Sequence, residues 1–206
     1  MQFHVDGFRA GDPRVRPADP AVVARPAALP DVVDVLIVGC GPAGLVLAAQ
    51  LAEFPTIATR IVERKSGPLE LGQADGVACR TVEMFEAFGL ANRLLDEAYW
   101  VNETVFWRPS QENRSRIVRT GRVQDVEDGL SEFPHVIVNQ ARIHDHLLSS
   151  MRRSPSRLEP DYDLEVVDVA VGDSGDRPVT VTLRRTDTAR VGTEVTVRAR
   201  YVVGCD

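Results

Sequence analysis

A glycine-rich turn, GCGPAG at residues 39–44, carries the clearest chemical signal in this chain. It lies between an apolar, β-branched run at 32–38 and a run with helical spacing at 43–54, which is the strand–turn–helix setting that a G-x-G-x-x-G turn requires. Gly39 permits the tight turn, Gly41 lets a pyrophosphate approach the backbone, and Gly44 lets the helix and strand pack closely. The helix N-terminus adds unpaired N–H groups and a partial positive charge. The turn therefore predicts a phosphate-binding site.

An acidic residue, Glu63, lies 19 residues after Gly44 and directly follows the apolar segment 59–62. At this position of a βαβ unit a carboxylate accepts hydrogen bonds from the ribose hydroxyls of an adenosine, and it disfavours a 2′-phosphate. The alternative is a surface glutamate that follows an ordinary glycine-rich turn. The combination of strand, turn, helix, second strand and acid favours the nucleotide site.

The elements that position these residues predict an α/β fold. Strand, glycine turn, helix and strand within about 30 residues form a βαβ unit, which carries parallel strands and a right-handed crossover. From Leu164 the pattern changes to short β-rich segments joined by turn-rich stretches, which indicates an antiparallel meander. We therefore expect a Rossmann-like domain in which a parallel sheet is followed by an antiparallel β-meander. Further helices are expected at 81–88, which stops at Gly89, and 142–151, and further strands at 136–138, 166–171, 179–183, 194–197 and 201–203.

The two ends of the chain differ from its middle. Residues 1–30 are rich in proline and contain no long apolar run, so we expect an extended N-terminal arm and no secretion signal. Residues 31–206 are expected to form the nucleotide-binding domain. The last expected strand, 201–203, is followed by only three residues, with no helix to cover it. We therefore expect this domain to be incomplete and truncated at its C-terminus.

Charge, cysteines and hydropathy exclude several classes of protein. Lys and Arg number 24 and Asp and Glu number 30, so the net charge of −6 has the wrong sign for a protein that neutralises nucleic-acid phosphates. Three cysteines without a C-x-x-C pair favour neither a disulfide framework nor a zinc site, and we expect no metal and a cytoplasmic location. The uncharged run 35–52 has the length of a membrane span, but its glycines and proline favour strand, turn and helix instead. No membrane association is expected.

Several segments of the sequence resemble one enzyme family. DVLIVGCGPAG, IVERK, GQADGVACRTVE, NQARIHDHL and YVVGCD are similar to the single-component, FAD-dependent aromatic hydroxylases of the phenol 2-monooxygenase branch, from about Asp34 to Asp206. MQFHVDGFR and VQDVEDGLSEFPHVIVNQARIHDHLL extend the resemblance within that branch. It implies FAD as cofactor, with NADPH or NADH and dioxygen as co-substrates. It also implies hydroxylation of a small phenolic acid, 3-hydroxybenzoate to 3,4-dihydroxybenzoate, and suggests a homodimer.

The same resemblance assigns roles to single residues. It places the FAD pyrophosphate at the glycine turn, the ribose at Glu63, a cation at Arg80 and a backbone contact to FAD at Gln140. Asp75 in the QADG loop is implied as the catalytic carboxylate that accepts a hydrogen bond from the phenol and helps to deprotonate it. The family has a further motif in which an aspartate is followed by a glycine. Asp206 matches this aspartate, but the glycine that should follow it is not in the sequence. The complete set of expected cofactor residues is Gly39, Gly41, Pro42, Ala43, Gly44, Glu63, Arg64, Arg80, Gln140 and Asp206.

Simpler interpretations stand beside these roles. Arg80 could pair with Glu83 or Glu86 at the surface, Asp75 could be a turn residue, and Gln140 could face solvent. For the whole chain, two other functions fit the glycine turn. One is the nucleotide-binding domain of an NAD-dependent dehydrogenase, and the other is a noncatalytic binding protein that keeps the fold. If the first interpretation holds, we expect residues 1–206 alone to be inactive as a hydroxylase.

Overall fold

The computed structural model describes residues 3–4, 7–8, 12, 14–23, 28–72, 74–173 and 175–206. The expected N-terminal arm lies partly outside the described residues, as does Gln73 of the QADG loop. The chain divides into two compact units, residues 1–70 with 147–206 and residues 71–146. Its elements are β1 (Phe3–His4), β2 (Gly7–Phe8), α1 (Pro20–Val23), β3 (Val32–Val38), α2 (Pro42–Leu51), β4 (Thr59–Val62), β5 (Gly76–Val77), α3 (Cys79–Ala87), α4 (Ala91–Glu97), β6 (Tyr99–Val101), β7 (Glu103–Pro109), β8 (Ile117–Gln124), β9 (His135–Ile137), α5 (Gln140–Arg153), β10 (Leu164–Val171), β11 (Val179–Arg185) and β12 (Glu194–Gly204).

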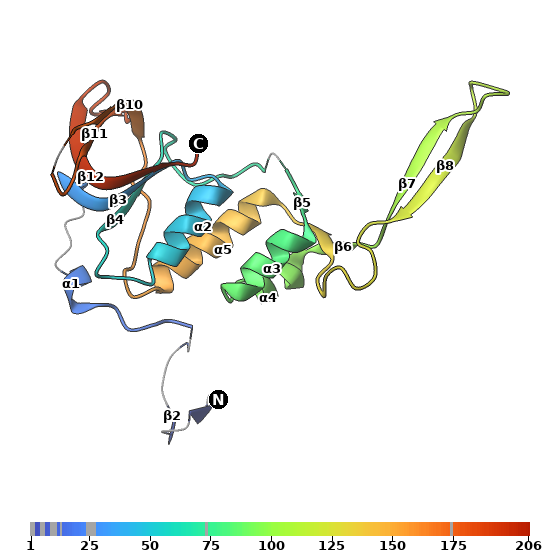
Figure 1. Cartoon of the computed structure of the whole chain (residues 1–206), viewed down its shortest axis with the longest axis horizontal. Coiled ribbons are helices and arrows are strands. Elements are labelled where there is room, and N and C mark those ends of the chain that lie inside the picture. The colour runs from blue at the N-terminus through green and yellow to red at the C-terminus, as the bar shows by residue number, and fades with distance from the viewer. Residues whose placement is uncertain are drawn as a thin grey trace. The chain divides into compact units, whose positions relative to one another are not determined.

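A mixed sheet with strand order β10-β11-β12-β3-β4 organises the first unit (Figure 1). β3 pairs in parallel with both β4 and β12, whereas β10, β11 and β12 pair antiparallel. All four residues of β4 are buried, as expected for a parallel strand that is covered on both faces. The expected α/β fold, a parallel sheet joined to an antiparallel meander, is confirmed.

One expectation about this sheet is wrong. The segments expected as separate strands at 194–197 and 201–203 form a single strand, β12. Its first half pairs antiparallel with β11 and its second half pairs in parallel with β3, and Ala199 pairs with both Val179 and Val33. In the sequence, the arginines on either side of Ala199 suggest that one strand ends there and another begins. They alternate with Val197 and Ala199, which are buried, so the strand continues without a break.

Close packing of the helix on the sheet holds the glycine turn in place. α2 buries Gly44, Leu45, Ala48 and Ala49, and the small side chains among them allow a close approach. Leu36, Ile37 and Ile61 of β3 and β4 are completely buried. Burial of each such side chain contributes about 1.5–3 kcal/mol. A cluster of buried residues extends this core into the meander: Val33, Leu36, Val62, Leu164, Val181, Leu183, Val197 and Ala199.

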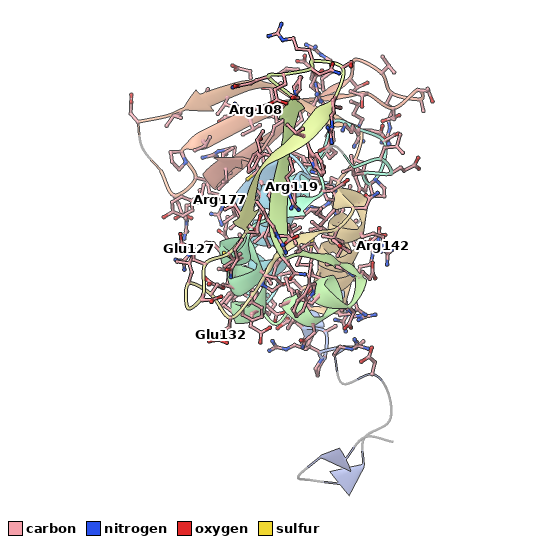
Figure 2. All side chains as sticks on the ribbon, turned by 90° about the vertical axis from the view of Figure 1, so that its right-hand side faces the viewer. Arg108, Arg119, Glu127, Glu132, Arg142 and Arg177 are labelled. Atoms are coloured by element: carbon pink, nitrogen blue, oxygen red, sulfur yellow. The ribbon has the colours of Figure 1, made fainter. Side chains whose placement is uncertain are left out.

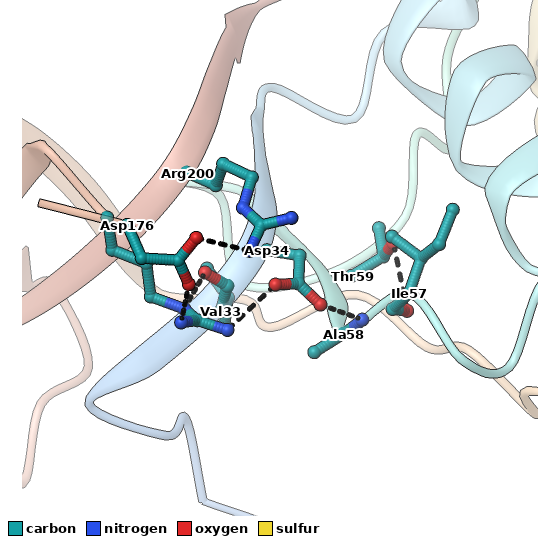
Figure 3. A network of polar contacts seen from close by, with 8 residues as sticks. Val33, Asp34, Ile57, Ala58, Thr59, Asp176 and Arg200 are labelled. Atoms are coloured by element: carbon teal, nitrogen blue, oxygen red, sulfur yellow. Dashed lines mark hydrogen bonds and ion pairs between the residues drawn. The ribbon is translucent and has the colours of Figure 1, made fainter.

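A polar network ties the β10–β11 turn to the start of β3 (Figure 3). Arg177 donates through Nε to the carbonyl of Val33 at 3.1 Å and through Nη2 to Oδ1 of Asp34 at 2.8 Å. The other oxygen of Asp34 accepts the N–H of Ala58 at 2.9 Å, just before β4. Asp176 pairs with both Arg177 and Arg200. The network therefore joins β12, β3 and the turn before β4 near the end of the sheet that lies opposite to the glycine turn.

The second unit contains a small sheet with strand order β5-β9-β6, the helices α3 and α4, and a β7–β8 hairpin. The expected strand at 136–138 is β9, and the expected helix at 81–88 is α3, after which Gly89 adopts a φ of +71°. Strands β7 and β8 were not expected. Both are largely exposed, and Arg108 and Arg119 belong to them (Figure 2).

The helices are short relative to a bilayer. None in the described part of the chain combines the length and the apolar character that are needed to cross a membrane.

Candidate cofactor site

The glycine turn connects β3 to α2, beside the ends of two neighbouring strands. The N–H of Gly39 donates to the carbonyl of Val62 at 2.9 Å, and the N–H of Cys205 donates to the carbonyl of Val38 at 2.8 Å. Gly39 has a φ of +100°, in the left-handed region that favours glycine. The turn is thereby fixed between the carboxyl ends of β4 and β12, where parallel sheets bind their ligands.

Gly44 and Gly41 are glycines for different reasons. A Cβ on Gly44 would lie 2.0 Å from the carbonyl oxygen of Gly39, so the contact between helix and turn excludes any side chain there. A Cβ on Gly41 would meet only the carbonyl oxygen of Cys205, at an ordinary 3.5 Å. The protein itself leaves room at Gly41, so a ligand that approaches the backbone explains a glycine at this position.

The N-terminus of α2 is open to a ligand. Gly41 is the N-cap and no side chain caps the helix, while Pro42 at the first position has no N–H to satisfy. The N–H groups of Ala43 and Gly44 belong to the first turn, which has no intrahelical acceptor. This end of the helix can therefore donate to an anionic group.

Glu63 lies at the end of β4 and is only 9% exposed. Its Oε2 accepts the N–H of Cys40 at 2.8 Å, and its Oε1 accepts the N–H of Lys65 at 3.0 Å. Each carboxylate oxygen has more than one acceptor position, so both can also accept hydrogen bonds from hydroxyl groups. The structure thus brings the expected ribose carboxylate directly against the glycine turn.

Asp206 also lies at this turn. A Cβ on Gly39 would come within 3.0 Å of the Cα and backbone N of Asp206. Arg64 follows Glu63 and is exposed, and its carbonyl accepts the hydroxyl of Thr186 at 3.0 Å. Of the expected cofactor residues, the first unit therefore gathers those of the turn together with Glu63, Arg64 and Asp206.

The thiol of Cys40, in the middle of the turn, is not a nucleophile. Burial, and then the negative charges of Glu63 and Asp161, raise its pKa to about 12. Burial also raises the pKa of the Cys205 thiol. Both groups therefore stay protonated and uncharged near neutral pH, which does not add negative charge to the phosphate site.

The remaining expected site residues belong to the second unit. Asp75 is exposed, and its carbonyl accepts the N–H of Val138 at 2.8 Å. Gln140 is the first residue of α5, and its Oε1 accepts the N–H of Ala74 at 3.4 Å. The structure thus brings Gln140 to the loop that carries Asp75, and its side chain does not simply face solvent. Arg80 is 90% exposed and pairs with Glu83 at 3.0 Å, as its simpler interpretation expected.

One polar pair in the second unit was not found from the sequence. Nδ1 of His135 lies 2.9 Å from Oδ2 of Asp125. His135 is in β9 and Asp125 follows β8, and no motif spacing links the two. The structure alone reveals the pair, because it forms only when β9 pairs with β6.

The first-unit site fits a dinucleotide. It offers an open helix N-terminus, a backbone at Gly41 that a ligand can reach, and a buried carboxylate beside the same turn. Anionic pyrophosphate suits the first two features and ribose hydroxyls suit the third. The site contains no metal-binding arrangement, since the described residues include no group of three or more His, Cys, Asp or Glu side chains that could hold a metal ion.

Comparison with known proteins gives a consistent result. Residues 32–206 match the family described as FAD binding domain. The chain is 63% identical over 207 aligned residues to 3-hydroxybenzoate 4-monooxygenase of Comamonas testosteroni, an alignment that covers 100% of this chain and 32% of the relative. It is 32% identical to a phenol 2-monooxygenase of Aspergillus fumigatus, over 85% of this chain and 28% of the relative. The chain therefore spans about a third of the length of these curated relatives.

Solved structures share the fold. The flavin-dependent monooxygenase PieE, in complex with FAD and substrate, has a TM-score of 0.69 at 24% identity, over 86% of this chain and 31% of its own. The p-nitrophenol 4-monooxygenase PnpA of Pseudomonas putida has a TM-score of 0.69 at 19% identity, over 86% of this chain and 42% of its own. The family match covers most of the chain, including the glycine turn, Glu63 and Asp75, and it confirms the resemblance seen in the sequence. This chain belongs to the FAD binding domain family.

Proposed function

We propose that this chain is the FAD-binding part of a monooxygenase that hydroxylates 3-hydroxybenzoate to 3,4-dihydroxybenzoate with NADPH or NADH and dioxygen. The observation that carries the proposal is the contact of Glu63 with the glycine turn, in a chain that is 63% identical to 3-hydroxybenzoate 4-monooxygenase. An NAD-dependent dehydrogenase would also need a glycine turn and an acid, but the family match is to a FAD-binding domain.

In this proposal the residues of the turn hold the cofactor by its adenosine and pyrophosphate. The N–H groups of Ala43 and Gly44 donate to pyrophosphate oxygens next to Gly41 and Pro42, and Glu63 accepts the ribose hydroxyls. Asp206 approaches Gly39 and completes this end of the site, beside Arg64. Arg80 and Gln140 hold other parts of the cofactor. When it is bound, FAD supplies a reduced ring that activates dioxygen for transfer of one oxygen atom to the substrate.

Asp75 acts on the aromatic substrate. A phenol becomes a better carbon nucleophile as its proton leaves, and a carboxylate that accepts a hydrogen bond from the phenolic hydroxyl promotes this change. Attack at the position para to the hydroxyl gives 3,4-dihydroxybenzoate. Asp75 is exposed in the described part of the chain.

Location and assembly follow as further parts of the proposal. Cys40, Cys79 and Cys205 are free thiols, which suits the reducing cytoplasm. We propose that the protein works there, that it binds neither nucleic acid nor membrane, and that it forms a homodimer.

The test is to purify the full-length protein encoded by the source gene and to measure bound flavin and product. Copurified FAD, with NAD(P)H-dependent formation of 3,4-dihydroxybenzoate from 3-hydroxybenzoate, is the expected result. Two comparisons accompany this assay: the full-length protein with phenol as substrate, and a protein that consists of residues 1–206 alone. Both are expected to give little product. Bound NAD without flavin would favour a dehydrogenase, and absence of any nucleotide would favour a noncatalytic binding protein.

A further inference from the structure

A short stretch of chain after α5 runs beside the end of β4 and holds the backbone of Glu63. The N–H of Asp161 donates to the carbonyl of Ile61 at 2.9 Å, and the carbonyl of Asp161 accepts the N–H of Glu63 at 2.9 Å. The carbonyl of Glu63 in turn accepts the N–H of Leu164 at 2.9 Å. The residue proposed to bind the ribose is therefore held through its own backbone by residues that are distant in the sequence.

This backbone pairing with β4 is short. Val62 and Asp161 form an isolated parallel bridge, and Asp161 belongs to no strand. Two residues later, Asp163 has a φ of +61°, in the left-handed region that does not occur in a regular strand. Because only a few main-chain hydrogen bonds connect the segment to β4, a side-chain contact has a large influence on the position of Asp161.

Arg60 supplies that side-chain contact. Its guanidinium donates through Nε to Oδ2 of Asp161 at 2.7 Å and through Nη2 to Oδ1 of the same carboxylate. The two side chains are only 9% and 15% exposed. A two-point contact of this kind fixes orientation as well as distance, and it is stronger than a hydrogen bond between neutral groups. Arg60 belongs to β4, which leads directly into Glu63, so the pair ties Asp161 to the strand that carries the ribose carboxylate.

Stability alone does not explain a buried ion pair at this place. Replacement of such a pair by apolar residues of similar volume is often neutral or stabilising, whereas a forked arginine–carboxylate contact sets a defined geometry. The pair also lies near the glycine turn. The negative charge of Asp161 is one of the causes that raise the pKa of the Cys40 thiol, after burial and the charge of Glu63.

We propose that Asp161, held by Arg60, positions Glu63 for the ribose hydroxyls of FAD. This inference rests on the proposed function, in which Glu63 accepts those hydroxyls. Asp161 is a positioning residue, because it acts through the backbone of Glu63. The Glu63 carboxylate already accepts the N–H groups of Cys40 and Lys65, so a shift of its backbone would redirect the acceptor positions that remain for the ribose.

The experiment titrates the full-length apo-protein with two ligands, FAD and the FAD analogue that contains 2′-deoxyadenosine. The ratio of the two dissociation constants measures the contribution of the ribose hydroxyl to binding, without turnover. The variants are Asp161→Asn, Arg60→Met and Glu63→Ala, each titrated at a temperature at which it is folded. Asp34→Asn is the matched control, because Asp34 is a carboxylate only 20% exposed that pairs with Arg177 at 2.8 Å in the same sheet.

We expect the wild-type protein to bind FAD about 10-fold more tightly than the deoxy analogue, because the analogue lacks a hydroxyl that bonds to a charged acceptor. Glu63→Ala should bring this ratio close to one, and both Arg60→Met and Asp161→Asn should lower it. The control should unfold more readily than wild type and keep the wild-type ratio. Asp161→Asn preserves the side-chain volume and one acceptor for Arg60, so it decides the question even where Arg60→Met does not fold.

A double variant tests whether Asp161 acts through Glu63. In the Glu63→Ala protein, Asp161→Asn should change the affinity for FAD little further, because the residue through which it acts has been removed.

Two results would overturn the inference. One is a wild-type ratio in Asp161→Asn, which would mean that Asp161 supports the fold without positioning Glu63. The other is a double variant in which the two losses of FAD affinity simply add. Failure of the proposed function looks different, because the wild-type protein would then not bind FAD, or Glu63→Ala would keep the wild-type ratio.

Discussion

The carboxylate of Glu63 accepts the backbone N–H of Cys40 at 2.8 Å, across 23 residues of sequence. This bond joins the end of β4 to the middle of the glycine turn. The residue expected to hold the ribose therefore also shapes the turn expected to hold the pyrophosphate. Changes at Glu63 should affect both parts of the site.

We predict that Glu63→Ala weakens FAD binding by about 1–3 kcal/mol, because the ribose loses a charged acceptor and the N–H of Cys40 loses its partner. Glu63→Gln should not restore it, since both carboxylate oxygens accept backbone N–H groups and the amide offers only one acceptor. Titration of apo-protein with FAD measures the effect. Unchanged affinity in Glu63→Ala would remove Glu63 from the site.

Gly44→Ala and Gly41→Ala should separate folding from binding. The added methyl at Gly44 would lie 2.0 Å from the carbonyl of Gly39, so this variant should unfold more readily than wild type. The methyl at Gly41 makes an ordinary contact, so that variant should keep its stability and lose affinity for FAD. Thermal unfolding without cofactor, followed by FAD titration, distinguishes the two. Equal stability of Gly44→Ala and Gly41→Ala would contradict the different roles assigned to these two glycines.

Arg177→Ala should lower the free energy of unfolding by about 1–3 kcal/mol, because the carbonyl of Val33 and the carboxylate of Asp34 lose their shared donor (Figure 3). Arg177→Lys should recover little, since an ammonium group cannot reproduce the planar guanidinium contacts. The control is Arg152→Ala, which removes an exposed pair with Glu159. Urea unfolding should show the control within about 1 kcal/mol of wild type. A similar small loss in Arg177→Ala would show that the network does not stabilise the fold.

Stability should fall in alkaline solution. The thiol of Cys40 has an ordinary pKa of 9.0 that burial and Glu63 raise to about 12 in the folded protein. Burial likewise raises the pKa of Tyr162 from 10.0 to about 12. The folded chain holds these protons more tightly than the unfolded chain, so their contribution is complete below pH 9 and is lost as the pH rises toward 12.

The measurement is the free energy of unfolding at several pH values from 8 to about 10.5. Each group can contribute at most about 1.4 kcal/mol per pH unit. Above pH 9, Cys40→Ala should reduce the slope of the free energy of unfolding against pH, while the contribution of Tyr162 to that slope remains. A slope that is the same in Cys40→Ala and wild type would mean that the Cys40 thiol is not held in its neutral form by the fold.

Asp75→Asn in the full-length protein should retain FAD but form less product per NAD(P)H consumed, because the phenol loses its anionic acceptor without a change in side-chain volume. The matched control is Asp96→Asn, an exposed carboxylate of α4 in the same unit. Product and hydrogen peroxide are quantified together. Full coupling in Asp75→Asn would reject its assigned role.

Local sequence signals predicted those elements of the fold that are defined by residues near one another in the chain. The bounds of β3 and β4 agree with expectation because both strands are short, apolar and bordered by clear turn or helix signals. The glycine turn between β3 and α2 was predictable for the same reason. The continuity of β12 was not, because the polar residues around Ala199 conceal a strand that changes partners halfway.

Other features could not be predicted, because no local pattern marks them. The β7–β8 hairpin has charged and apolar residues on both faces, so its sequence lacks the regular alternation of a half-buried strand. The sequence indicated that Glu63 binds the ribose, but it gave no sign that the Glu63 carboxylate accepts a hydrogen bond from the backbone N–H of Cys40. The pairing of His135 with Asp125 requires β9 to lie beside β6, which no local pattern encodes.

The most direct test of the central claim is the affinity of the full-length protein for FAD in wild type and Gly41→Val. The valine side chain would fill the space beside the N-terminus of α2 through which the pyrophosphate reaches the backbone. We predict that the wild-type protein purifies with FAD, and that Gly41→Val folds but retains none. A wild-type protein that does not bind FAD, or a valine variant with wild-type affinity, would contradict the assignment of this turn as the cofactor site.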